Sequence, residues 1–284
     1  MYFRQKTELF SRARRALILG AVVLSLTTVM AAGGKRVIRK PSYDPAAESV
    51  ALFDGVDTGL LDATLVAKNP HQGNVLIENK SKKALTVQMP KSVAAVQVLK
   101  QGFGGGAGGG IGGQQGGIGG GGGGQSLGGG TGGGQQGLGG AGGVGGAGGG
   151  GGFFSIPAET TVQLPFTSVC LEHGKADPRP SMTYKLVRLE SYTKDPVLQQ
   201  LITSYAGGKI DPEVAQAAVW HVANGMSWQE LANKSVSSLG GLPSRPYFAP
   251  EKLMAAQSFV LQATAQVRER EKEKKSPATI EKNL

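Results

Sequence analysis

Cys170 is the only cysteine among the 284 residues of the chain. One cysteine cannot form an internal disulfide bond, so in an oxidising compartment its thiol is free, intermolecular or bonded in another way. Counting by twos from Val162, Leu164 and Phe166 places Cys170 on the apolar face of a predicted strand. One interpretation is therefore a buried, inert thiol, since cysteine is among the most often buried residue types.

A second interpretation comes from three stretches of sequence near this cysteine. Residues 166–178 combine Cys170 with a polar turn and a proline, and residues 214–220 place a glutamine and a tryptophan four positions apart. With a tyrosine-containing helix at 201–208, they resemble the thioester domains of bacterial surface adhesins over about Phe166 to Trp228. The residues that match the family's motifs are Cys170, Lys175, Pro178, Gln216 and Trp220, whereas Leu171 and Glu172 replace the family's aromatic residue and asparagine.

This resemblance implies an internal thioester between Cys170 and Gln216. A thiolate attacks the side-chain amide, ammonia leaves, and the activated acyl group is stored until an external amine or hydroxyl takes it. His173 or His221 is a candidate for proton transfer, because histidine titrates near neutral pH. Trp220 lies four residues after Gln216 on the same helix face, where its indole can shelter the bond from water.

Other interpretations of the same residues remain open. Gln216 can be a surface or capping residue of an alanine-rich helix, and Trp220 can simply belong to the core. Cys170, His173 and His221 can also be ligands of a zinc ion, with Glu172 or water as the fourth ligand, since His71 is expected to lie far away. A thiol enzyme with a Cys–His pair is a further alternative, although the sequence shows no orienting Asn or Asp motif.

The first 31 residues predict a signal peptide. A basic stretch that ends in Arg14-Arg15 precedes an apolar run over residues 16–30, and the small residues Ala31 and Ala32 follow. The run is shorter than the roughly 20 residues that span a bilayer, and the sequence has no second run of that length. We therefore expect an exported protein, periplasmic or extracellular, with no transmembrane segment after cleavage.

The net charge of +10 does not predict nucleic-acid binding. Part of the positive charge lies in the signal peptide, and part lies in the tail that follows it. Residues 268–275 alternate in sign and largely cancel each other. No basic stripe interleaved with aromatic residues occurs in the part expected to fold.

The remaining chain predicts an α+β protein whose β part is an antiparallel, immunoglobulin-like sandwich. Residues 32–58 are expected to be a flexible lead-in, residues 59–101 the first half of the sandwich, and residues 153–192 its second half. Apolar alternation predicts short strands separated by turn residues at 61–67, 74–79, 84–89, 93–99, 153–156 and 160–166.

Most of the 47 glycines of the chain fall between residues 102 and 152. This composition is far from that of folded domains, so the stretch is expected to be a disordered insertion in a loop of the sandwich. It has no Lys and no suitably placed Ser or Thr for a phosphate-binding loop.

Helices are expected after Thr193, in a helical subdomain over residues 193–265 followed by a charged tail over 266–284. Asp195-Pro196 and Asp211-Pro212 are typical helix starts, Asn224-Gly225 is a typical helix end, and Ser227 with Glu230 forms a capping box. The whole sequence predicts a non-enzymatic binding or cell-envelope module whose partner is a protein or polysaccharide at the cell surface. A purely structural envelope protein is the alternative, and a metal-binding or thiol enzyme is the third.

Overall fold

The computed structural model describes residues 36–98, 124–131, 152–236 and 243–275. The chain divides into two units, Met1–Arg36 and Val37–Leu284, and only Arg36 of the first unit is among the described residues. The predicted signal peptide therefore lies outside the described residues. The second unit contains all the elements below.

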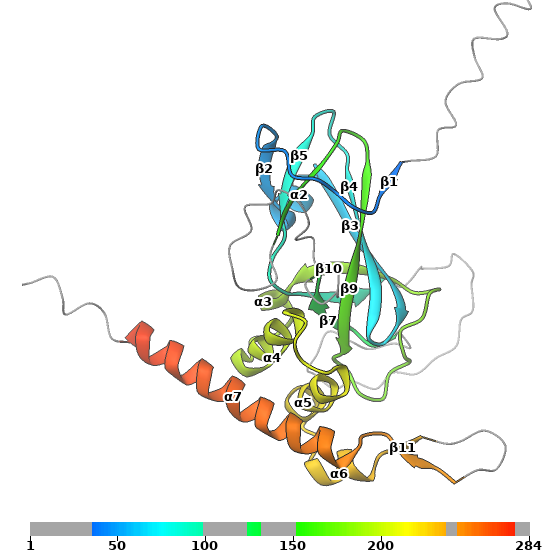
Figure 1. The fold of residues 1–284 in the computed structure, drawn as a ribbon, viewed down its shortest axis with the longest axis vertical. Helices are drawn as coiled ribbons and strands as arrows, with labels where there is room; N and C mark the ends of the chain where they lie inside the picture. Colours follow the sequence, from blue (N-terminus) through cyan, green and yellow to red (C-terminus); the bar gives the residue numbers. More distant parts are fainter. Residues whose placement is uncertain (1–35, 99–123, 132–151, 237–242, 276–284) are drawn as a thin grey trace, which may run out of the picture. The chain divides into compact units, whose positions relative to one another are not determined.

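Six antiparallel strands of the second unit close into a barrel (Figure 1). The order around the barrel is β9-β4-β3-β10-β6-β7, and β7 pairs back with β9. The strands are β3 (Leu61–Asn69), β4 (Gln72–Asn79), β6 (Val93–Gln97), β7 (Leu127–Gly130), β9 (Thr161–Cys170) and β10 (Thr183–Arg188). The prediction of an immunoglobulin-like sandwich is therefore wrong, because the sheet closes on itself, whereas the α+β class is compatible with the structure.

The described part of the predicted lead-in contributes regular structure at one end of the barrel. Strand β1 (Val37–Ile38) pairs with β9 in parallel. Strand β2 (Glu48–Ala51) joins β5 (Leu85–Gln88) and β8 (Phe153–Ile156) in a separate three-stranded sheet, and the helix α2 (Leu52–Asp57) follows β2. Residues 32–58 were expected to be a flexible lead-in, but strands β1 and β2 within this range form main-chain pairs with β9 and β5.

Strand β7 comes from the middle of the glycine-rich stretch that was expected to be disordered. Its glycines allow close approach, because a Cβ added to Gly129 would lie 1.9 Å from the carbonyl oxygen of Thr167. A Cβ on Gly128 would lie 2.9 Å from Ile202 of the helix that covers the strand. Alternation of apolar residues cannot reveal such a strand, since its sequence is Leu-Gly-Gly-Gly.

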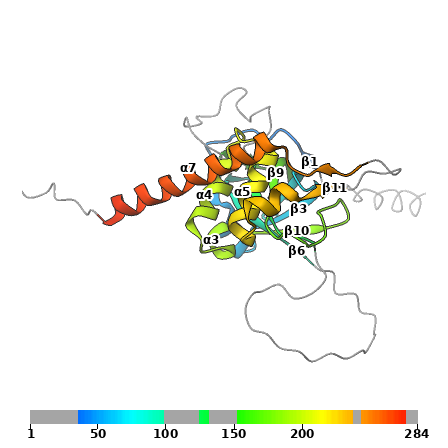
Figure 2. The ribbon, with the colours of Figure 1, turned by 90° about the horizontal axis from the view of Figure 1, so that it is seen from below.

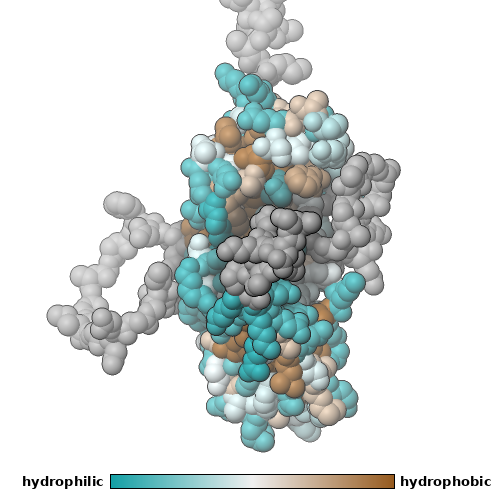
Figure 3. All heavy atoms as spheres, turned by 90° about the vertical axis from the view of Figure 1, so that its left-hand side faces the viewer, coloured by the Kyte–Doolittle hydropathy of each residue, from teal (hydrophilic) through white to brown (hydrophobic). Residues whose placement is uncertain are grey.

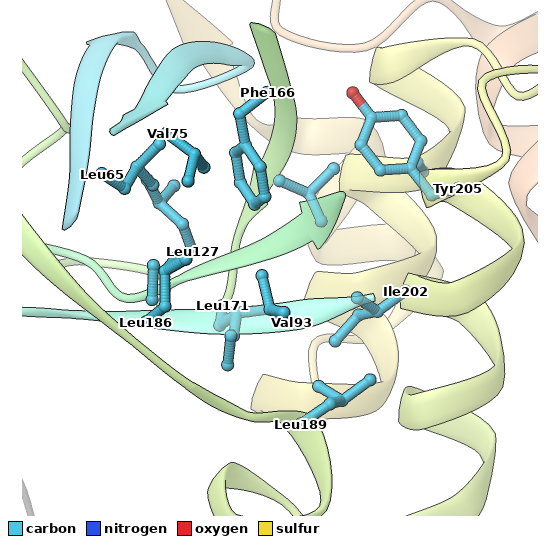
Figure 4. Close-up of a cluster of buried hydrophobic side chains, with 14 of the residues drawn as sticks. Leu65, Val75, Val93, Leu127, Phe166, Leu171, Leu186, Leu189, Ile202 and Tyr205 are labelled. Atoms are coloured by element: carbon cyan, nitrogen blue, oxygen red, sulfur yellow. The ribbon is translucent and has the colours of Figure 1, made fainter. Parts of the chain in front are cut away.

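The interior of the barrel is filled by apolar side chains from all of its strands. Figure 4 shows Leu65, Val75, Leu127 and Phe166 gathered there, together with Leu186. Glycines 128 and 130 of β7 lie against Ile202 and Ala206 on the outside of the barrel. The barrel wall formed by β7 and the last residues of β9, Ser168 to Cys170, is therefore covered by helices and buried on both faces.

The helices predicted after Thr193 are present and begin at the expected caps. They are α4 (Pro196–Ala206), α5 (Pro212–Asn224), α6 (Trp228–Asn233) and α7 (Pro250–Lys275), and a short helix that was not predicted, α3 (Leu189–Tyr192), precedes them. The carboxylates of Asp195 and Asp211 accept main-chain N–H groups at the starts of α4 and α5. Gly225 ends α5 with a φ of 67°, a left-handed conformation that favours glycine.

Helix α7 lies along α4 and α5 in both Figure 1 and Figure 2. Its buried side chains are Leu253, Ala256, Phe259, Ala263 and Val267, and residues 268–275 are exposed. The helix thus continues ten residues into the segment expected to be a charged tail, since Glu, Lys and Arg are good helix formers. Before it, β11 (Ser235–Val236) and β12 (Arg245–Pro246) form a short hairpin.

The face drawn in Figure 3 carries hydrophobic side chains in small groups among hydrophilic ones. Exposed large hydrophobic residues of the described part include Phe153 on β8, and Met254 and Leu261 on α7. Single exposed apolar residues are normal on protein surfaces and do not mark a docking site.

Replacing Gly129 with Ala is predicted to lower the free energy of unfolding by about 3 kcal/mol, because the new Cβ meets a main-chain oxygen in a packed wall. Urea unfolding followed by circular dichroism measures this change.

Gly152→Ala is the matched control, since a Cβ there meets nothing within 4 Å. Equal stability of the two variants would show that β7 is not packed in the barrel wall as described.

Candidate functional site

Cys170 is the last residue of β9 and is 1% exposed. The register is continuous through Pro165, and Leu127 of β7 lies directly opposite Cys170. Because opposite residues of paired strands share a face, the Cys170 side chain points into the barrel with Leu127. The sulfur therefore lies among the core side chains.

The side-chain amide of Gln216 binds the main chain of Cys170 through two hydrogen bonds. The Cys170 N–H donates to Gln216 Oε1 at 2.9 Å, and Gln216 Nε2 donates to the Cys170 carbonyl oxygen at 2.8 Å. These two residues are 46 positions apart, and Gln216 is 1% exposed. The structure thus brings together the two residues that the adhesin resemblance pairs.

The amide occupies the place that a further residue of β4 would take. The Ser168 N–H donates to the carbonyl oxygen of His71, which directly precedes β4, and Cys170 is the next residue of β9 that faces the same edge. On the opposite edge, the Leu171 N–H donates to Ser126 beside β7. Gln216 therefore completes the hydrogen bonding of β9 where the strand β4 no longer covers it.

Helix α5 presents Gln216 to the barrel because the helix is buried over most of its length. Its residues Val214 to Trp220 are all buried, and the helix start is fixed by Asp211. The Asp211 carboxylate also accepts a hydrogen bond from Lys252 of α7 at 2.5 Å. Desolvation alone would raise the pKa of Asp211, but the hydrogen bond from Lys252 and those from the helix amides lower it below its usual range.

The environment of Cys170 suppresses its ionisation. Burial, with a smaller effect of the negative charge of Asp177, raises the pKa of the Cys170 thiol to about 12. A thiolate is the reactive form of cysteine. The thiol is therefore protonated at neutral pH and unreactive toward soluble reagents while β9 stays covered.

The two histidines expected to transfer protons make other contacts. His221 Nδ1 lies 2.7 Å from the carbonyl oxygen of Met226, and the ring stacks on Trp228. His173 Nε2 lies 3.0 Å from Lys234 Nζ, and burial and the charge of Lys234 lower the pKa of His173. Neither ring has a described contact with the Cys170 sulfur.

Trp220 belongs to an aromatic cluster one helical turn beyond Gln216. The ring centroids of His173 and Tyr247 lie 4.8 and 5.6 Å from that of Trp220, and Lys234 Nζ lies 5.3 Å from it. Trp220 is 3% exposed, and its indole N–H has no hydrogen-bond partner among the described residues. Trp220 is therefore packed among other rings and is almost fully buried.

Glu172, considered as a metal ligand, instead anchors the start of β7. Its carboxylate accepts the N–H of Ser126 and the ammonium of Lys175, at 2.9 and 2.6 Å. Burial raises the pKa of Glu172, but these hydrogen bonds lower it overall. Within the described ranges, no three His, Cys, Asp or Glu side chains are grouped as metal ligands would be.

His71, which was expected to lie far from Cys170, lies on the same edge of β9 as Gln216. It lines a cavity of about 570 Å³, and burial lowers the pKa of its imidazole. The pairing of β4 with β9 brings it there, and no pattern within the sequence identifies that pairing in advance.

Searches against family models, curated proteins and solved structures find no match to this chain. In the described part of the chain, no helix combines the length and the apolar character needed to cross a membrane.

Replacing Gln216 with Leu is predicted to lower the free energy of unfolding by about 2 to 4 kcal/mol, because a buried N–H and a buried carbonyl of Cys170 both lose their partners. Thermal or urea unfolding checks this value.

The control is Gln229→Leu, since the Gln229 amide is exposed and bonds only Asn233 in the described contacts. A change within about 0.5 kcal/mol is expected there. Equal effects of the two substitutions would contradict a structural role for the Gln216 amide.

Proposed function

We propose that this chain is an exported cell-envelope module that forms an internal thioester between Cys170 and Gln216 and uses it to attach covalently to a surface amine or hydroxyl. The observation that carries the proposal is the buried contact between the Gln216 amide and the main chain of the lone cysteine. The resemblance to adhesin thioester domains and the predicted signal peptide support it independently.

The hydrogen bonds around the amide suit the chemistry of bond formation. The Cys170 N–H points at Gln216 Oε1 from 2.9 Å, and this oxygen becomes negatively charged when sulfur attacks the amide carbon. The Cys170 carbonyl oxygen holds the nitrogen that must leave. The N–H and the carbonyl of Cys170 thus orient the oxygen and the nitrogen of the Gln216 amide.

The step balances without any added reagent. The carbon–sulfur bond forms, the carbon–nitrogen bond breaks, and the thiol proton leaves on the departing ammonia. Because the pKa of the thiol is about 12, that proton must be transferred as the bond forms and is not lost beforehand. Low exposure of both residues protects the product from water.

A second candidate function is structural, and a specific observation favours it. The protonated thiol and the two main-chain hydrogen bonds together describe a stable joint between α5 and the barrel. In that case the module works through its surface and Cys170 remains an inert core residue.

Intact-mass analysis of the purified mature protein separates the two candidates. The thioester predicts a mass that is short by one ammonia, and a gain of one methylamine molecule when the protein is incubated with that amine. The measurement uses the native fold, because unfolding exposes the bond to hydrolysis.

Cys170→Ala is the matched control, and its mass must equal the full calculated value. A full mass for the natural chain, with a thiol that reacts with DTNB only after denaturation, would reject the thioester and favour the structural joint.

A further inference from the structure

Strand β7 fills a slot in the barrel wall between β6 and β9, beneath α4. Three of its residues pair with β6, and all four pair with β9. Residues 98–126 connect it to β6 and residues 131–152 connect it to β8, and both connections are rich in glycine. The strand that closes the barrel is therefore a short element held between two long connections.

The slot accepts only glycine at the positions that face β9 and α4. A Cβ at Gly129 would lie 1.9 Å from the carbonyl oxygen of Thr167, and a Cβ at Gly130 would lie 2.7 Å from the Cβ of Ala206. Contacts this short require the wall or the helix to move. A strand with ordinary side chains at these positions therefore cannot enter the slot.

Two side chains of this segment are held by the surrounding structure. Leu127 is fully buried in the barrel interior (Figure 4). Gln125 is 2% exposed, and its Nε2 donates to Asp177 Oδ1 at 2.9 Å. With the three glycines that follow Leu127, these residues define the pattern that the slot accepts, Gln-x-Leu-Gly-Gly-Gly.

A second copy of the chain supplies a strand that fits this slot. An incoming β7 segment makes the same hydrogen bonds and the same packing contacts as the resident one, because the two sequences are identical. Glycine-rich strands specify their pairing weakly and are prone to exchange between molecules. The resident strand has the advantage of its connections, which corresponds to an effective concentration on the order of 1 mM.

We propose that the slot between β6 and β9 is an interaction site for the β7 segment of a second copy, and that copies of this protein join by exchanging this strand. Reciprocal exchange closes a two-fold dimer in which each barrel is completed by its partner. The proposal goes beyond the proposed function and does not depend on the thioester, since β7 is held by its main chain, Leu127 and Gln125.

Disulfide trapping of two variants tests the exchange. The donor is Leu127→Cys/Cys170→Ala and the acceptor is Ala95→Cys/Cys170→Ala, so neither variant can form the thioester. Leu127 and Ala95 are opposite residues of β7 and β6. Opposite residues of antiparallel strands have Cα atoms about 4.5 to 5.5 Å apart, which a disulfide bond can span.

The two variants are unfolded in urea, refolded together in a glutathione redox buffer and analysed by intact mass. A disulfide-linked pair of one donor and one acceptor is expected. Its fraction should rise about tenfold between ~0.1 and ~1 mM protein, because the second copy competes with a tethered strand. No linked pair at ~1 mM would overturn the proposal.

The single chain Ala95→Cys/Leu127→Cys/Cys170→Ala checks the geometry of the trap. It is expected to form an internal disulfide bond at micromolar concentration, where exchange is negligible. Failure to form this bond would contradict the pairing of β7 with β6 and would overturn the slot on which the proposal depends.

Two further donors test whether the link depends on the fit of the strand. Adding Gly129→Ala to the donor is expected to abolish the linked pair, because the new Cβ meets the carbonyl oxygen of Thr167. Adding Gly152→Ala is the matched control and should leave the yield unchanged, since a Cβ there meets nothing within 4 Å. Equal yields from the two donors would show that the link forms by collision and would overturn the exchange.

The identity of the exchanged segment is tested with Leu138→Cys/Cys170→Ala as the donor. Residues 136–140, which lie outside the described residues, repeat the first five positions of the pattern, but Ala141 stands where Gly130 does. A lower yield than that of the Leu127→Cys donor is expected, because a Cβ at the position of Gly130 meets Ala206. An equal or higher yield would overturn the assignment of the exchanged segment to β7.

Discussion

The end of β9 leaves main-chain groups that must find hydrogen-bond partners inside the protein. Cys170 is buried, and its N–H and carbonyl lie on the edge of β9 that β4 covers. The pairing with β4 ends at Thr167, before it reaches Cys170. A buried peptide group without partners is strongly unfavourable. The Gln216 amide carries the same donor and acceptor pair as a peptide, so it satisfies both groups at once and joins α5 to the barrel.

The opposite edge of β9 depends on a different device. There β7 closes the barrel, and its glycines let it fit between β6 and β9 beneath α4. Leu127 lies opposite Cys170, so the cysteine is enclosed by a glycine-rich strand on one edge and by a side-chain amide on the other. The glycines of β7 are small and the Gln216 amide is planar, so α4 and α5 can pack closely against β7 and the end of β9.

The sequence predicts the parts of this fold that leave local signals. Capping residues such as Asp195, Asp211 and Ser227 mark the helices, and apolar alternation marks most barrel strands. The sequence does not predict closure of the barrel, because the Leu-Gly-Gly-Gly sequence of β7 shows no alternation of apolar and polar residues. It also does not predict β10 as a separate strand, since that part of residues 153–192 was assigned to the second half of the sandwich without strand bounds. At the site, family resemblance paired Cys170 with Gln216, but His71 reaches it only through the β4–β9 register, which sequence patterns do not encode.

The contact between the Gln216 amide and the Cys170 main chain stabilises the fold, and the same two amide atoms would take part in the proposed chemistry. Loss of ammonia would remove the donor to the Cys170 carbonyl, yet the Gln216 oxygen could keep its hydrogen bond from the Cys170 N–H. The new covalent bond would close a loop of 46 residues, and by the chain-entropy account such a link restricts the unfolded chain. The joint already fixes α5 against β9, and in the proposed cycle transfer to an amine would return Gln216 to a hydrogen-bonding role through the new amide.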